Sequence, residues 1–154
     1  MAQSEKTDPV AVCLDADVLI AGLLSRRGAS HAILILGEIG LLQVVLPEAA
    51  VEEVRRNLAA KLPEASPLFQ EFLRAVAVRI YRPGPRNRER ARSLADPKDI
   101  PIMAAAIGAS ARLLVTHNLR HFRSGEGVRV IRPRQLLEEA RAWMGSFGSK
   151  EAGR

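Results

Sequence analysis

Five short segments rich in apolar residues alternate along this chain with longer segments that carry helix signals, and this alternation constrains the fold most. A continuous apolar run such as 10–14 is typical of a strand that is buried on both faces, as strands of parallel sheets are. Strands that alternate with helices predict right-handed crossovers. We therefore predict an α/β fold, a three-layer α/β/α sandwich with a central, mostly parallel five-stranded sheet. Its predicted strands are residues 10–14, 42–46, 76–81, 112–115 and 128–131.

Prolines, glycines and capping residues place the helices between these strands. Ser30 is the candidate N-cap of the second helix. Pro47 opens the third helix and Pro63 breaks it, because proline fits the first turn of a helix but not its interior. The predicted helices cover residues 18–24, 30–40, 47–62, 67–75, 87–94, 99–109 and 133–144.

Length and composition limit the class of protein. A chain of 154 residues suits one domain, which we place at residues 9–145, with flexible ends at 1–8 and 146–154. Cys13 is the sole cysteine, so no disulfide can form within the chain, which suits a reducing compartment. The sequence contains no recognisable signal peptide and no apolar run near the roughly 18 residues of a membrane span. We therefore expect a cytoplasmic protein that is not in a membrane.

Four of the five aspartates of the chain fall in two groups, Asp15 with Asp17 and Asp96 with Asp99. Carboxylates beside apolar runs are unfavourable unless they cap a helix, pair with another group or carry a function. Asp15 directly follows the first predicted strand, and open α/β sheets bind ligands at the carboxyl ends of their strands. Asp17 is better explained as the cap of the following helix. The grouping predicts a metal-dependent active site.

The sequence Asp96-Pro97-Lys98-Asp99 allows two helix starts. A start at Pro97 would place Pro101 a full turn inside the helix, where its ring and its missing N–H are unfavourable. A start near Asp99 instead puts Pro101 in the first turn, and the helix dipole then favours the negative charge of Asp99. We expect one of the two aspartates to cap the helix and the other to be free for chemistry.

Thr116-His117-Asn118 follows the fourth predicted strand and should face the same sheet edge as Asp15. Asn118 is equally compatible with a loop role and with a functional one. His117 and His121 have a spacing found in zinc sites, but no third nitrogen or sulfur ligand stands nearby, which disfavours zinc.

The helix predicted at 47–62 offers three glutamates, Glu48, Glu52 and Glu53. At 3.6 residues per turn, its valines and leucines form one buried stripe. Glu48 lies closest to that stripe and Glu53 lies far round from it. Periodicity alone therefore does not choose the functional glutamate.

The net charge of +6 comes almost entirely from arginine, because lysine occurs at only four positions. Arginine matches the geometry of phosphate, which favours a nucleic-acid partner, although a compositional bias of the genome explains the charge equally well. Five arginines crowd residues 82–92, just before Asp96. Such a run is most often a solvated helix face, but its closeness to the carboxylates makes Arg86 and Arg88 candidate phosphate contacts.

Four segments of the chain together resemble the PIN-domain nucleases over about residues 10–137. Within that family, the likeness is greatest to a branch with many toxin-like (VapC-type) proteins of bacterial toxin–antitoxin systems. Each segment is modest by itself, whereas the four in this order and spacing are specific. The segments are VCLDADVLIAGLL, VVLPEAAVEEVRRNL, ADPKDIPIMAAAIGASARLLVTHNLRHF and VRVIRPRQLL.

The resemblance implies an α/β/α sandwich whose acidic residues bind Mg²⁺ or Mn²⁺ and cut single-stranded RNA. Asp15 matches the first acid of the family, Glu53 the second, Asp99 the third, and Asp96 an additional acid of this branch. Two positions depart from the pattern: Asn118 falls where many members have a fourth aspartate, although this branch often carries Asn there, and His121 stands where relatives of this branch often have aspartate before Phe122. Asp17 stands where Asn is usual. The resemblance also implies a small antitoxin partner and a homodimer.

The resulting hypothesis is metal-assisted hydrolysis of phosphodiester bonds in RNA. Asp15 and Asp99 would hold the ion, and Glu53 and Asp96 would orient a water molecule. Asn118 would bond a water or a phosphate oxygen. Thr116, with Arg86 and Arg88, would contact the substrate.

Three other classes compete with this hypothesis. An aspartate-nucleophile phosphatase would need a lysine and an acidic pair beyond Thr116, and no aspartate follows Asp99. A receiver domain would need an aspartate at the end of the third strand, which reads Ile80-Tyr81-Arg82. A catalytically weak or inactive PIN-like module that binds RNA or protein remains as the main alternative.

Overall fold

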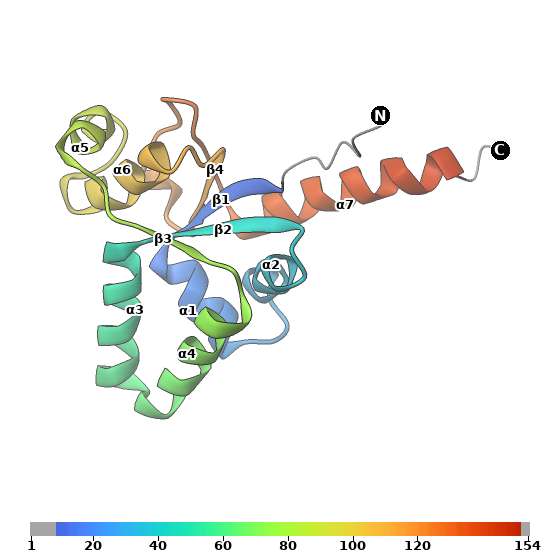
Figure 1. Cartoon of the computed structure of the whole chain (residues 1–154), viewed down its shortest axis with the longest axis horizontal. Coiled ribbons are helices and arrows are strands. Elements are labelled where there is room, and N and C mark those ends of the chain that lie inside the picture. Colours follow the sequence, from blue (N-terminus) through green and yellow to red (C-terminus); the bar gives the residue numbers. More distant parts are fainter. Residues whose placement is uncertain (1–8, 152–154) are drawn as a thin grey trace, which may run out of the picture.

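The computed structural model describes residues 9–151 and contains a five-stranded sheet in the order β3-β2-β1-β4-β5 (Figure 1). Every neighbouring pair of strands is parallel. The central strand β1 is buried on both faces, and Val12, Cys13 and Leu14 are each 0% exposed. This explains its continuous apolar sequence. The strands are β1 Val10–Leu14, β2 Leu42–Pro47, β3 Arg79–Tyr81, β4 Leu113–Val115 and β5 Arg129–Ile131.

Helices cover both faces of the sheet, which confirms the predicted three-layer α/β/α fold. In Figure 1, α1, α3 and α4 lie on one side of the strands and α5 and α6 on the other. Residues 102–107 of α6 are all buried, and a run of alanines there lets this helix lie close to the sheet. The helices are α1 Ala16–Leu24, α2 Ala29–Glu38, α3 Glu48–Lys61, α4 Ser66–Ala75, α5 Pro85–Ala91, α6 Ile100–Gly108 and α7 Pro133–Glu151.

The apolar helices α1 and α2 belong to the core. Their side chains Val18, Leu19 and Ile33 are each 0% exposed. Among residues 9–151, no single helix is long and apolar enough to cross a membrane, and α1 and α2 reach that length only as a pair bent by 94°. Burial in the core accounts for their apolar composition.

The predicted starts of α2 and β3 are wrong. Gly28, not Ser30, stands at the N-cap of α2. Ser30 lies inside the helix and is buried, and its hydroxyl oxygen is 3.1 Å from His117 Nε2, so it makes a tertiary contact instead of a cap. Strand β3 begins at Arg79 and not at Val76, because the Val76 N–H still bonds to the Phe72 carbonyl at the end of α4.

The last helix continues beyond its predicted end. Helix α7 extends to Glu151, whereas the sequence predicts its end at Met144. The segment 146–154, predicted to be flexible, therefore begins within a helix. The other predicted loose ends, 1–8 and 152–154, lie outside the described residues.

Candidate active site

The carboxyl ends of β1 and β4 place the first two side chains of the site. Leu14 pairs with Val115 across these strands, so Asp15 and Thr116, which follow them, lie side by side. The Thr116 hydroxyl donates a 2.9 Å hydrogen bond to Asp15 Oδ2. Both side chains are buried, Asp15 being 7% and Thr116 0% exposed. A buried carboxylate thus stands at the sheet edge where ligands of open α/β sheets bind.

Asp15 also caps α1, which corrects the assignment of that role to Asp17. Asp15 has an extended backbone, and its Oδ1 accepts a 2.8 Å hydrogen bond from the Ala16 N–H. Asp17 lies within the first turn of the helix, where its side chain points to other partners. One carboxylate therefore both starts the helix and faces the site.

Asp17 ties α1 to the loop after β4. Its Oδ2 accepts hydrogen bonds from the His117 N–H at 3.0 Å and from Asn118 Nδ2 at 3.2 Å. The Asn118 N–H in turn donates to the Thr116 hydroxyl oxygen at 3.0 Å. Asn118 thus lies at the site, where it is exposed to solvent and its side-chain amide donates to Asp17. The sequence analysis missed Asp17 as a site residue.

The second pair of carboxylates lies at the 3₁₀ turn Pro97–Asp99: Asp96 precedes the turn and Asp99 ends it. Asp99 stands at the N-cap position of α6 with Pro101 in the first turn, as predicted, yet neither aspartate makes a side-chain capping bond. The expectation that one of them caps the helix is therefore wrong. Both face His121 instead: its Nδ1 lies 2.6 Å from Asp96 Oδ2 and 3.6 Å from Asp99 Oδ2.

Burial makes the charged forms of Asp15, Asp17 and Asp99 unfavourable. It raises the pKa of Asp15 from the ordinary 3.8 to about 7, and the negative charge of Asp17 adds to this rise. Hydrogen bonds from Thr116 and from the Ala16 N–H work in the opposite direction. A cation placed here would stabilise the ionised carboxylates.

The pKa values of Asp17 and Asp99 are raised in the same way. Burial is the largest cause that raises the pKa of Asp17 and of Asp99. Lys98 and His121 lower the pKa of Asp99, whereas the charges of Asp96 and Asp17 raise it. Because the charge of Asp17 acts on both Asp15 and Asp99, the two pairs form a single electrostatic cluster.

The structure distinguishes the three glutamates of α3. The charge of Glu53 raises the pKa of Asp15, so Glu53 lies within electrostatic reach of the cluster. Glu48 lies 4.0 Å from Arg82 in an exposed ion pair, and Glu52 is exposed. Glu53 is itself exposed, so its electrostatic effect on Asp15 is what separates it from the other two glutamates.

A comparison with protein families decides the identity of this fold. A family model described as the PIN domain matches residues 11–120. The chain belongs to the PIN domain family. The matched residues include all four aspartates of the cluster, Glu53 and Asn118, and they end one residue before His121.

Solved structures share the fold of this PIN domain. A chain of DNA-bound VapBC from Salmonella typhimurium matches with a TM-score of 0.64 and 16% identity, over 80% of this chain and 98% of that chain. A chain of VapBC2 from Rickettsia felis, bound to a DNA fragment from the promoter, matches with a TM-score of 0.60 and 12% identity, over the same shares. At these identities the likeness concerns the fold. Among curated proteins, none matches the chain.

The carboxylates of the PIN domain fit a divalent cation. Within the described residues, Asp17 Oδ1 and Asp99 Oδ2 are buried oxygens without a hydrogen-bond partner. Buried oxygens of this kind are unfavourable unless a donor or a cation satisfies them. Carboxylate oxygens are also the ligands that Mg²⁺ and Mn²⁺ prefer. Among the described residues, the three potential ligand atoms that lie within 4.8 Å of one another belong to Asp96, Asp99 and His121, so Asp99 is in this compact group and Asp15 and Asp17 are outside it.

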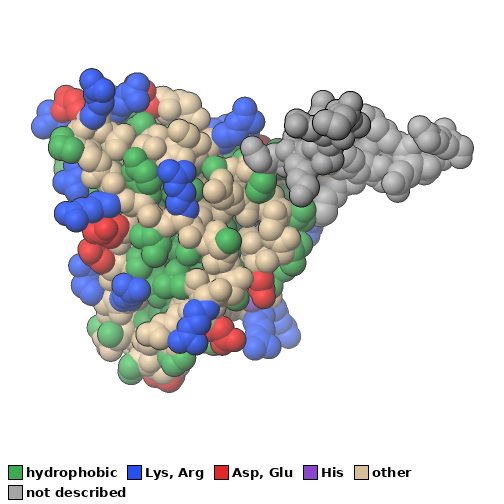
Figure 2. All heavy atoms as spheres, in the orientation of Figure 1, with side chains coloured by type: hydrophobic (Ala, Val, Ile, Leu, Met, Phe, Trp, Pro, Cys, Tyr) green, Lys and Arg blue, Asp and Glu red, His purple; other side chains and the backbone are tan. Residues whose placement is uncertain are grey.

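A hollow of about 460 Å³ adjoins the cluster, and two arginines line it, Arg120 and Arg132. Its other lining residues include Asp96, Asn118 and His121. The predicted phosphate contacts, Arg86 and Arg88, lie on α5 and are not among the residues that line this hollow (Figure 2 shows the basic residues at that end of the molecule). The sequence analysis missed Arg132, although it directly follows β5 and so shares the sheet edge of Asp15.

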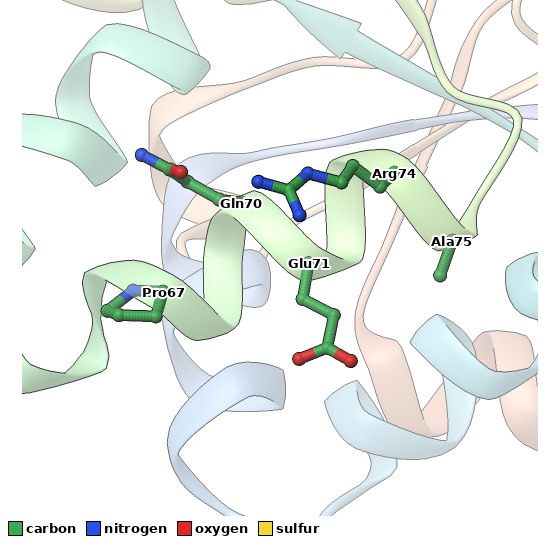
Figure 3. Close-up of a pocket in the computed structure, with 5 residues that line it drawn as sticks. All are labelled: Pro67, Gln70, Glu71, Arg74 and Ala75. Carbon is green, nitrogen blue, oxygen red and sulfur yellow. The ribbon is translucent and has the colours of Figure 1, made fainter.

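A second hollow, of about 560 Å³, lies along α4 (Figure 3). All its lining residues come from that one helix, and no residue of the acidic cluster is among them. They are Pro67, Gln70, Glu71, Arg74 and Ala75. The volume of a hollow therefore does not identify the candidate site of this PIN domain. The clustered carboxylates identify it.

Proposed function

We propose that this PIN domain is a divalent-metal-dependent endoribonuclease that cuts single-stranded RNA and acts as the toxin of a toxin–antitoxin pair. The acidic cluster carries the proposal. Asp15, Asp17 and Asp99 have raised pKa values, and two of their oxygens are buried without a hydrogen-bond partner among the residues that the structure describes. Such an arrangement is unfavourable without a cation, and strongly perturbed carboxylates gather at catalytic sites.

Each residue of the cluster has a role in this proposal. Asp15 and Asp99 hold Mg²⁺ or Mn²⁺, and the bound ion supplies the positive charge that favours deprotonation of water and offsets charge on phosphate. Thr116 keeps Asp15 in place through its hydroxyl hydrogen bond. Asn118 and the His117 N–H hold Asp17. Glu53 and Asp96, which are more exposed, orient the attacking water and accept its proton.

Binding of Mn²⁺ tests the cluster directly. Wild-type protein is expected to bind Mn²⁺ in calorimetry, and Asp99→Asn to bind at least about tenfold more weakly, because it loses a charged ligand. Glu52→Gln is the matched control, since it removes the same charge from an exposed position on α3. Equal binding by Asp99→Asn and wild type contradicts the assignment. No binding by wild type contradicts the proposed function.

Arg120 and Arg132 are proposed to contact the RNA backbone, because they line the hollow beside the carboxylates. With metal removed by a chelator, Arg132→Ala is expected to weaken binding of single-stranded RNA oligonucleotides. The slope of log affinity against log salt should fall by about 1. Arg86→Ala, on α5, is the control. If Arg86→Ala reduces the slope and Arg132→Ala does not, RNA follows α5, as the sequence alone predicts.

One alternative rests on two residues of the site. An amide at Asn118 stands where many family members carry aspartate, although this branch often has Asn, and an imidazole at His121 stands where relatives of this branch often have aspartate. With less negative charge, the domain could be a weak or inactive enzyme that binds RNA or protein. RNA binding that needs no metal and leads to no cleavage would favour this alternative.

The proposed protein partner rests on the similarity of this chain to solved structures. The similar solved chains come from VapBC complexes, which supports a small antitoxin as the partner of this chain. A homodimer and a cytoplasmic location are proposed from the family resemblance and from the composition, respectively.

A further inference from the structure

We infer that His121 is a ligand of the bound cation through Nδ1, and that it makes the site prefer first-row transition ions such as Mn²⁺ over Mg²⁺. The inference deepens the proposed nuclease function and rests on it. Its basis is a compact group of three side chains, Asp96, Asp99 and His121. One potential ligand atom from each lies within 4.8 Å of the other two.

The backbone holds His121 against the carboxylates. His121 ends the 3₁₀ turn Leu119–His121, and an antiparallel bridge joins Ala95 to Phe122 directly beside it. The Asp96 N–H donates to the His121 carbonyl at 2.9 Å. The bridge places the backbone of His121 beside that of Asp96, and the imidazole Nδ1 lies 2.6 Å from the Asp96 carboxylate. A ligand set that is held in place in this way loses little conformational entropy on binding.

The hydrogen bonding of the group is incomplete without a cation. His121 Nδ1 lies 2.6 Å from Asp96 Oδ2, a hydrogen-bond distance, but 3.6 Å from Asp99 Oδ2, which is too long for one. Among the residues that the structure describes, the latter oxygen is buried and has no hydrogen-bond partner. A proton on the imidazole is therefore shared only with Asp96, whereas a cation bound by His121 Nδ1 and Asp99 Oδ2 would satisfy the Asp99 oxygen and leave Asp96 free to orient the water.

The nitrogen ligand determines which ions suit the group. Mg²⁺ prefers an octahedral shell of oxygen atoms, whereas imidazole binds first-row transition ions well. The neutral imidazole also brings no negative charge, which weakens attraction for an ion that depends on charge alone. His121 should therefore reduce affinity for Mg²⁺ more than for Mn²⁺.

His117, four residues earlier in the same loop, is a matched control. Its Nε2 lies 3.1 Å from the Ser30 hydroxyl oxygen, and it does not belong to the three-residue group. Both histidines are close to the acidic cluster, but only one is in a position to bind the ion. A spectroscopic signal from a bound imidazole should therefore depend on His121 alone.

Pulsed electron paramagnetic resonance of bound Mn²⁺ tests the inference, because it detects the ¹⁴N nucleus of a coordinated imidazole. We expect this signal in wild type and in His117→Asn, and its loss in His121→Asn. His121→Asp should still bind Mn²⁺ without the signal. Its preference for Mn²⁺ over Mg²⁺, measured by competition, should fall on the order of tenfold.

The possible results separate this inference from the proposed function. A wild-type Mn²⁺ complex without the ¹⁴N signal, or a signal that persists in His121→Asn, overturns the role of His121 and leaves the carboxylate site intact. An unchanged ion preference in His121→Asp overturns the selectivity. If wild type binds no Mn²⁺, both the inference and the proposed function fail.

Discussion

Asp15→Asn is expected to reduce RNA cleavage on the order of a thousandfold, because a bound metal ion contributes several kcal/mol to stabilisation of the transition state. Asp15 is the carboxylate at the end of the central strand, and it is 7% exposed. The asparagine oxygen can still accept hydrogen bonds from the Ala16 N–H and the Thr116 hydroxyl. The variant should therefore keep the cap of α1 and the fold while it loses the charge that holds the ion.

The measurement is cleavage of a mixed set of single-stranded RNA oligonucleotides in the presence of Mn²⁺, with circular dichroism as the check on folding. Glu52→Gln serves as the control, since it removes the same charge from an exposed position on α3. Undiminished cleavage by a folded Asp15→Asn protein would remove Asp15 from the mechanism. A loss of activity in the control would show that net charge, and not the cluster, governs cleavage.

Part of the site is predictable because its signal is local. Asp15 ends an uninterrupted apolar run, and that position alone places a carboxylate at the edge of the sheet. Pro101 fixes the start of α6, because a proline has no backbone N–H and is tolerated only in the first turn. Asp99 therefore lies at the N-terminus of that helix. These inferences need no knowledge of the rest of the chain.

The remaining residues depend on contacts that are distant in sequence. Asp17 in the first turn of a helix has the same local pattern as a cap, and its partners His117 and Asn118 approach it only when β1 pairs with β4. Glu53 lies away from the buried face of α3, so periodicity gives no reason to select it. Arg132 follows β5 and reaches the edge of Asp15 only because β5 pairs with β4, a contact that no local pattern shows.

The fold itself followed from strand and helix alternation, and the errors lie at element ends. Strand β3 keeps only Arg79–Tyr81, because the segment before it still completes the end of α4. The edge position of β3 explains its weak signal: Arg79 and Ile80 are exposed, so this strand lacks the continuous apolar run of β1.

The metal-free protein is expected to be more stable at pH 5 than at pH 8, on the order of 2 kcal/mol. Burial raises the pKa of Asp15 to about 7, against 3.8 for an ordinary aspartate. Between these values the folded protein binds a proton more tightly than the unfolded chain does. Stability therefore falls as the pH rises from about 4 to about 7, and the shifts of Asp17 and Asp99 act in the same direction.

Denaturant unfolding with a chelator present, at pH 5 and pH 8, measures this effect. Asp15→Asn should be more stable than wild type at pH 8, because it removes a charge that is unfavourable in the buried site. Mn²⁺ should stabilise wild type at pH 8 but not Asp15→Asn. Glu52→Gln again controls for net charge. Equal wild-type stability at both pH values, or an Asp15→Asn protein that is less stable than wild type at pH 8, would mean that the cluster does not favour a cation.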